Sequence, residues 1–141
     1  MQNNELINAL YQNTEMGISS IKKIYPKIQN TNLKNEVKNQ LSNYKTQHNQ
    51  ITRSMKSNDI IPQKVPLMIK AMTSAGIAFN CAKDCSSEHL AEMLIQGTNM
   101  GIIKINQALN RTSFANSKFV DEAKSMLQKE QQYIDNLKKY L

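Results

Sequence analysis

The sequence predicts a single all-α domain, an up-down four-helix bundle built from two similar helical hairpins with a short connecting helix between them. Gly and Pro are scarce, at 4 and 3 of 141 residues, and the abundance of Lys, Asn, Gln, Leu and Ile is typical of helices. Four long segments carry apolar residues spaced alternately three and four apart, as the buried face of a packed helix does. A chain of this length can bury one continuous core.

The first hairpin should span residues 3–57. A first helix, over about residues 3–29, has an apolar seam of Ile7, Leu10, Thr14, Gly17, Ile21, Ile24 and Ile28. Pro26 should kink its last turn. The polar turn at residues 30–32 supplies side chains that can cap a second helix, and that helix has a seam of Val37, Leu41, Tyr44, His48, Ile51 and Met55. Because the turn is short, we expect antiparallel neighbours.

Residues 58–85 should connect the two halves, because Pro62 and Pro66 lie in a polar cluster that cannot continue a helix. Residues 67–79 are apolar, contain Met and are too short to cross a membrane, so we expect a connecting helix packed over the bundle.

The second hairpin should span residues 86–141, with Ser86 or Ser87 capping its first helix and Ser117 its second. Its seams are Leu90, Met93, Leu94, Gly97, Met100, Gly101, Ile105 and Ala108, and then Val120, Ala123, Leu127, Glu130, Ile134, Leu137 and Leu141.

An internal repeat relates the two halves. Residues 12–21 and 96–105 agree in Gln, Thr, Met, Gly and two Ile positions, and each copy is followed by a turn and another helix. A tandem duplication of a hairpin would produce this pattern. Gly17 and Gly101 each cost a helix about 1 kcal/mol relative to Ala, so we expect them to let the first and third long helices approach, or else to leave room for a large side chain or ligand.

Charge and cysteine content narrow the classes of function. The formal charge of +7 comes almost entirely from Lys, with Arg only at Arg53 and Arg111, and the lysines alternate with Asn and Gln as on a solvated face. This argues against nucleic-acid binding. No signal-peptide pattern and no apolar run near the ~20 residues of a membrane span is present. We therefore expect a cytoplasmic protein with Cys81 and Cys85 as free thiols.

Polar residues interrupt the seams at His48 and Glu130, where burial is costly without a partner. At 1.5 Å per residue, Glu15, His48 and Glu130 each lie about 24 to 26 Å from the turns at one end of the bundle, and Asn99, the repeat partner of Glu15, lies at a similar height. We predict one polar layer from all four helices. It would be either a hydrogen-bonded network that fixes helix register or a site for one iron, manganese or zinc ion.

A second polar stripe lies on the third long helix, at His89, Glu92, Gln96 and Asn99. His89 and Glu92 are further candidate metal ligands. Cys81, Cys85 and His89 would form a soft metal site if the helix continued through residues 84–87, but that segment has the composition of a helix boundary.

The repeat, the crossover and the inward carboxylates resemble the ferritin-like superfamily over nearly the whole chain. Residues 89–101 (HLAEMLIQGTNMG) resemble a stretch of small bacterial proteins with ferritin-like bundles, a family that has no established activity. The resemblance implies a metal site, since di-iron members use a Glu on two helices and Glu-x-x-His on the other two. This chain departs from that pattern: Asn99 stands where the second single Glu would be, and Glu-x-x-His is absent.

Two functions follow from these patterns. One is a non-enzymatic bundle that acts by self-association or by docking a partner protein on residues 67–79, which requires an exposed apolar patch. The other is a degenerate ferritin-like protein that binds a single metal ion through Glu15, His48 and Glu130, with His89 or Glu92. An enzyme of another kind has no support, because the sequence has no Ser-His-Asp, Cys-His or phosphate-binding glycine signature.

Overall fold

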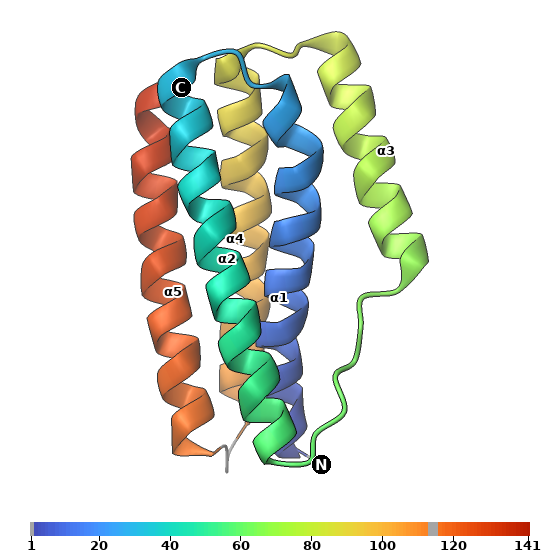
Figure 1. The fold of residues 1–141 in the computed structure, drawn as a ribbon, viewed down its shortest axis with the longest axis vertical. Helices are drawn as coiled ribbons and strands as arrows, with labels where there is room; N and C mark the ends of the chain where they lie inside the picture. Colours follow the sequence, from blue (N-terminus) through green and yellow to red (C-terminus); the bar gives the residue numbers. More distant parts are fainter. Residues whose placement is uncertain (1, 113–115) are drawn as a thin grey trace.

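The computed structural model describes residues 2–112 and 116–141, and within these ranges the chain forms helices and no strand. The α-helices of the described residues are α1 (Gln2–Ile24), α2 (Thr31–Ser57), α3 (Leu67–Lys83), α4 (Ser87–Arg111) and α5 (Ser117–Leu137). The four long ones lie side by side, and α3 stands outside them (Figure 1). The all-α prediction is therefore confirmed. No described helix is both long and apolar enough to cross a lipid bilayer.

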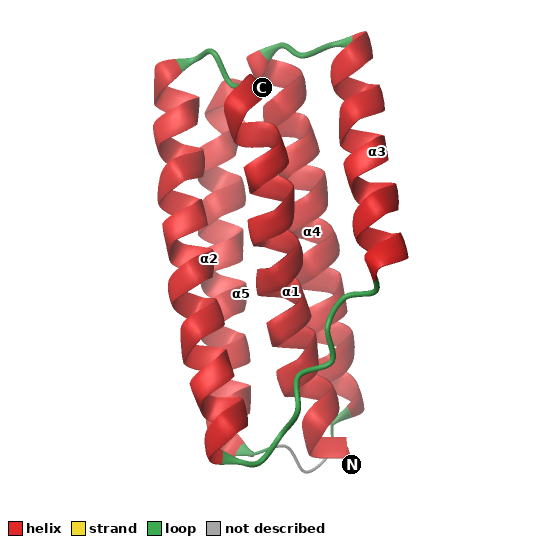
Figure 2. Cartoon of the chain, turned by 45° about the vertical axis from the view of Figure 1, so that its right-hand side comes forward, coloured by secondary structure: helices red, strands yellow, loops and turns green. Residues whose placement is uncertain are grey.

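The four long helices run antiparallel to their neighbours. α1 and α5 run in one direction and α2 and α4 in the other, as the colours of Figure 1 show. α1 packs on α2 and α4, and α5 packs on the same two helices. The connection from α2 to α4 climbs the outside of the molecule and includes α3 (Figure 2). This crossover brings the chain back to the end from which α2 started.

Side-chain caps set the starts of three helices. Asn30 caps α2 by accepting a hydrogen bond from the Leu33 amide at 3.0 Å, and Ser86 caps α4. The α5 cap is Asn116, one residue before the predicted Ser117. At the other end of the first hairpin, α1 stops at Ile24 and Pro26 lies in η1 (Tyr25–Lys27), a single turn of 3-10 helix. Proline cannot donate the backbone hydrogen bond that would extend the α-helix.

The core consists of two apolar clusters with a polar layer between them. The first contains residues such as Leu6, Leu10, Met55, Ile105 and Phe119. The second contains residues such as Ile21, Val37, Leu90, Tyr133 and Leu137. Most predicted seam positions are buried or half-buried. Exceptions are Gly97, Met100 and Leu141, which are exposed. Between the clusters the interior holds buried polar side chains, among them Thr14, Gln47, Thr98 and Glu130.

Candidate functional site

Glu130 of α5 is the ionisable group at the centre of the polar layer. It is 1 % exposed. Its Oε1 accepts a hydrogen bond from Asn13 Nδ2 of α1 at 3.0 Å, and its Oε2 accepts one from the Tyr44 hydroxyl of α2 at 2.8 Å. No salt bridge reaches Glu130 from any described residue. Two neutral donors therefore hold this carboxyl group, which satisfies its oxygens without cancelling its charge.

The protonation of Glu130 reflects that environment. Burial raises the pKa of Glu130 from 4.5 to about 7, although the hydrogen bonds from Tyr44 and Asn13 act in the opposite direction. Burial, together with the nearby Glu130 charge, raises the pKa of Tyr44 well above its ordinary value. The carboxyl group can thus bind or release a proton near neutral pH inside the core.

Gly17 and Gly101 make room for the two donors. A Cβ atom on Gly17 would lie 2.7 Å from the Tyr44 ring, and one on Gly101 would lie 2.2 Å from Asn13 Oδ1. The repeated glycines therefore accommodate side chains that bind Glu130. Of the two explanations offered by the sequence, the space for a side chain is the one that these contacts support.

Glu15 does not join the polar layer. Its Oε1 forms a salt bridge with Lys70 of α3, and its Oε2 accepts a hydrogen bond from the Val65 amide at 3.1 Å. Both contacts lie on the crossover. Glu15 follows the buried Thr14 by one residue, and that single step turns a side chain by about 100° around the helix. Its role in the structure is to fasten the crossover to α1.

His48 contacts a different set of groups. Thr14 Oγ1 donates to the Tyr11 carbonyl at 2.7 Å, and the same oxygen lies 3.0 Å from His48 Nδ1. With the hydroxyl proton used on the Tyr11 carbonyl, this contact is a hydrogen bond in the His48 tautomer that carries its hydrogen on Nδ1. The His48 ring also packs on Tyr11, with ring centroids 5.0 Å apart. Neither contact involves Glu130 or Glu15, so the predicted layer divides into separate groups.

The predicted stripe on α4 faces outward. Glu92, Gln96 and Asn99 are exposed, and His89 Nδ1 lies 3.7 Å from Glu92 Oε2. The structure therefore pairs His89 with Glu92 but does not bring them to Glu15, His48 or Glu130. Within residues 2–112 and 116–141, no three His, Cys, Asp or Glu side chains are placed to hold one metal ion.

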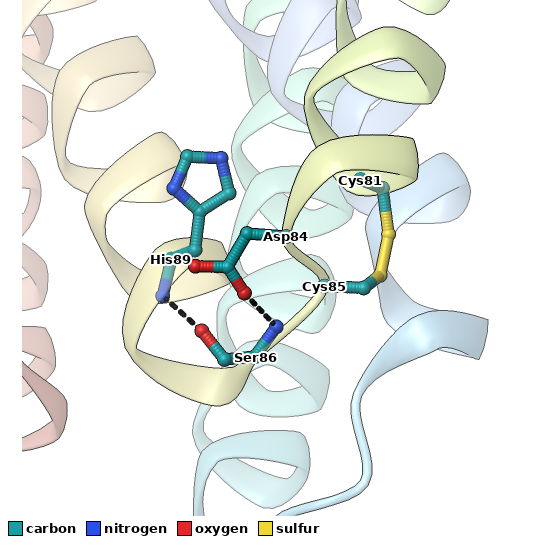
Figure 3. The surroundings of a disulfide bond; sticks show 5 residues. All are labelled: Cys81, Asp84, Cys85, Ser86 and His89. Carbon is teal, nitrogen blue, oxygen red and sulfur yellow. Dashed lines mark hydrogen bonds between the residues drawn. A yellow bond between two sulfur atoms is a disulfide. The ribbon is translucent and has the colours of Figure 1, made fainter.

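Cys81 and Cys85 are joined in a disulfide, which corrects the expectation of free thiols. Helix α3 ends at Lys83, and the chain then turns so that the two Cα atoms are 4.4 Å apart, close enough for the bond (Figure 3). In the same turn Asp84 accepts a hydrogen bond from the Ser86 amide. The disulfide closes the end of α3 directly before the cap of α4.

Helix α3 turns its apolar side to solvent. Its inner side carries Lys70, which pairs with Glu15, and the helix has one buried residue, Ile77. Its outer side includes Met68, Met72 and Phe79, which are 74 %, 68 % and 62 % exposed. This is the reverse of an ordinary surface helix, whose apolar stripe faces the core. Residues 67–79 therefore carry the exposed apolar patch that self-association or the docking of a partner would require.

Comparisons with known proteins identify no relative: no protein-family model, no curated protein and no solved structure matches the chain. The Glu130 carboxyl group is almost fully buried. The outer face of α3 is freely accessible, and is therefore the candidate site for an interaction.

Proposed function

We propose that the protein acts by self-association, with the outer face of α3 of one copy packed against the same face of a second copy. The observation behind this proposal is the inverted orientation of α3, whose large apolar side chains are exposed while its ion-paired side faces the bundle. Contiguous exposed apolar patches on water-soluble surfaces mark interaction sites. Catalysis is not needed to explain any group on this face.

The arrangement of small residues suits a helix as the partner. Four exposed alanines follow one line along α3, at spacings of four, three and four: Ala71, Ala75, Ala78 and Ala82. Small side chains let two helix backbones approach closely. Met68, Met72 and Phe79 flank this line, and flexible Met side chains adapt well to a partner surface.

Charge favours a second copy over an acidic partner. The charged residues of α3 are Lys70 and Lys83. Lys70 pairs with Glu15 on the inner side, and the Lys83 ammonium group lies 4.4 Å from the centre of the Phe79 ring. The outer face therefore carries a single charge, the Lys83 ammonium group near the C-terminal end of α3, although the whole chain carries +7. Two such faces can meet around a two-fold axis without opposing like charges.

The size of the face sets the expected affinity. A helix of 17 residues is about 25 Å long. One side of a helix this short offers less surface than the ~800 Å² that each partner contributes to a standard interface. Burying an exposed Met or Phe contributes about 1.5–3 kcal/mol, against several kcal/mol lost on association. We therefore expect a reversible dimer with a dissociation constant in the micromolar range.

The architecture that we propose is a ferritin-like four-helix bundle made of two hairpins. Its support is the antiparallel packing of the four long helices, the long crossover and the repeat between residues 12–21 and 96–105. The repeat copies lie at corresponding places in α1 and α4. In this architecture α3 is an addition to the crossover, and it is the element available for association.

Sedimentation velocity from micromolar to millimolar protein concentration tests the proposal. Wild type should shift from monomer to dimer, and Ala75→Arg should remain monomeric because it puts a charge in the centre of the line of alanines. Asn43→Arg, at an exposed position of α2, is the matched control and should dimerise as wild type does. Thermal melts should show that both variants are folded.

Two outcomes would reject self-association. One is a wild-type chain that stays monomeric at millimolar concentration. The other is an Ala75→Arg protein that dimerises with the wild-type dissociation constant.

A further inference from the structure

The disulfide between Cys81 and Cys85 joins two residues that are only 4 positions apart in the sequence. A disulfide stabilises a fold mainly by restricting the unfolded chain, and this effect is smallest for short loops. A chain of 141 residues can also bury its core without a cross-link. The stability of the whole fold therefore does not explain why the bond is placed here.

The bond lies at the surface of the molecule. Cys85 is exposed, and so are residues 82–84 and 86 in the same turn (Figure 3). Cys81 is half-buried and packs against the second apolar cluster. Exposed disulfides are the ones that exchange with thiols in solution, and access decides which of the two sulfurs is attacked. An attacking thiol therefore reaches the sulfur of Cys85 more easily than that of Cys81.

The disulfide also fixes the C-terminal end of α3. Near its start the helix is held by the salt bridge between Lys70 and Glu15, and Ile77 is its one buried residue. Beyond Ile77, residues 78–80 and 82–83 are exposed, and Cys81 is half-buried. The bond joins Cys81 to the residue directly before Ser86, which caps α4. Opening the bond would leave the last turn of α3 with few contacts that hold it.

We infer that Cys81 and Cys85 form a reversible redox switch, in which small thiols attack Cys85, open the disulfide and release the C-terminal end of α3. The attacking thiolate forms a bond to Cys85 Sγ, the bond between the two cysteines breaks, and its electron pair stays on Cys81 Sγ, which takes a proton from water. A second thiolate attacks the sulfur of the bound thiol and releases Cys85. Two thiols are thus oxidised to one disulfide, and the disulfide of the protein is reduced to two thiols.

Mass spectrometry of the folded wild type in mixtures of reduced and oxidised glutathione tests the switch. After acid quenching and alkylation, the reduced fraction should follow one curve whether the protein starts oxidised or reduced, and the bond should open fully without denaturant. A bond that opens only in urea would identify a structural cross-link. Two thiols that oxidised glutathione does not join would show that the pair is not a redox couple. Either result would overturn the inference.

Single-cysteine variants decide which sulfur reacts. Cys81→Ser keeps the exposed Cys85 and should form a mixed disulfide with oxidised glutathione about tenfold faster than Cys85→Ser, which keeps the half-buried Cys81. Equal rates, or a faster reaction at Cys81, would overturn the assignment of Cys85 as the attacked residue. Circular dichroism checks that both variants are folded, and the wild-type titration requires neither of them.

Amide hydrogen exchange measures the release of α3, at submicromolar concentration so that pairing of two copies does not contribute. Reduction of the wild type should speed exchange over residues 78–83 and leave residues 67–73 unchanged, because Lys70 and Glu15 hold that end of the helix. The double variant Cys81→Ser, Cys85→Ser should show the reduced pattern with or without glutathione. Unchanged exchange over residues 78–83 on reduction would overturn the inference. A protein that never self-associates would leave all three expected results as they are.

Discussion

Replacing Gly101 with Ala should destabilise the protein, although the same change stabilises most helices. The new Cβ atom would lie 2.2 Å from Asn13 Oδ1, so the Asn13 side chain has to move. That movement breaks its 3.0 Å hydrogen bond to Glu130 and leaves one oxygen of a buried carboxyl group without a donor. The loss is about 1.5–3 kcal/mol for a hydrogen bond to a charged group, against a gain in helix propensity of about 1 kcal/mol.

Gly97 provides the matched control, one turn earlier in the same helix. A Cβ atom on Gly97 meets nothing within 4 Å, and the position is exposed. Gly97→Ala should therefore stabilise the protein by about 0.5–1 kcal/mol, whereas Gly101→Ala should destabilise it by about 0.5–2 kcal/mol. The opposite signs come from the contact with Asn13 alone.

Urea denaturation followed by circular dichroism measures these differences. A double-mutant cycle isolates the contact: in an Asn13→Ala background, Gly101→Ala should become stabilising, because the side chain that it displaces is gone. If Gly101→Ala raised the free energy of unfolding as much as Gly97→Ala does, the proposed role of Gly101 in the Glu130 layer would be refuted.

Two further predictions concern the ionisable groups. Folding raises the pKa of Glu130 from 4.5 to about 7, so between these pH values the folded chain holds a proton that the unfolded chain has lost. The stability that comes from this proton is fully present below about pH 4.5. It is lost as the pH rises through about 7, and the free energy of unfolding falls by about 3 kcal/mol. Glu130→Gln should therefore lose less stability than wild type between those pH values in urea melts, and equal losses would contradict the assignment. Glu15→Gln removes the charge that pairs with Lys70, so amide hydrogen exchange should become faster in α3 and stay unchanged in α2; unchanged exchange in α3 would show that the salt bridge does not fasten the helix.

The sequence predicted the buried faces of the long helices better than it predicted the contacts between them. Apolar spacing placed Glu130 inside the core, and it is buried. The rise per residue placed Glu15 at the same height along the bundle as Glu130. Height does not determine which way a side chain points around the helix axis, and Glu15 points to Lys70 of α3 instead. The donors Asn13 and Tyr44 were missed. The signal that could have found them was the repeated glycine, read as space for a side chain.

The orientation of α3 lay beyond what its own sequence could predict. The segment is apolar on most of its circumference, so periodicity does not indicate an inner side. The salt bridge between Lys70 and Glu15, two residues from different helices, fixes which side faces α1. The disulfide was missed for a related reason, because the spacing of Cys81 and Cys85 suits either free thiols on a helix or a bond across a turn, and the end of α3 at Lys83 decides between them.

The most direct test of self-association through α3 is an isotope-filtered NMR experiment on a mixture of copies with ¹³C-labelled Met methyl groups and unlabelled copies. An antiparallel pair centred on Ala75 predicts intermolecular contacts between Met72 of one copy and Phe79 of the other. Such contacts in wild type, and their loss in Ala75→Arg, would support the account. No intermolecular contact at millimolar concentration, or contacts only from other helices, would contradict it.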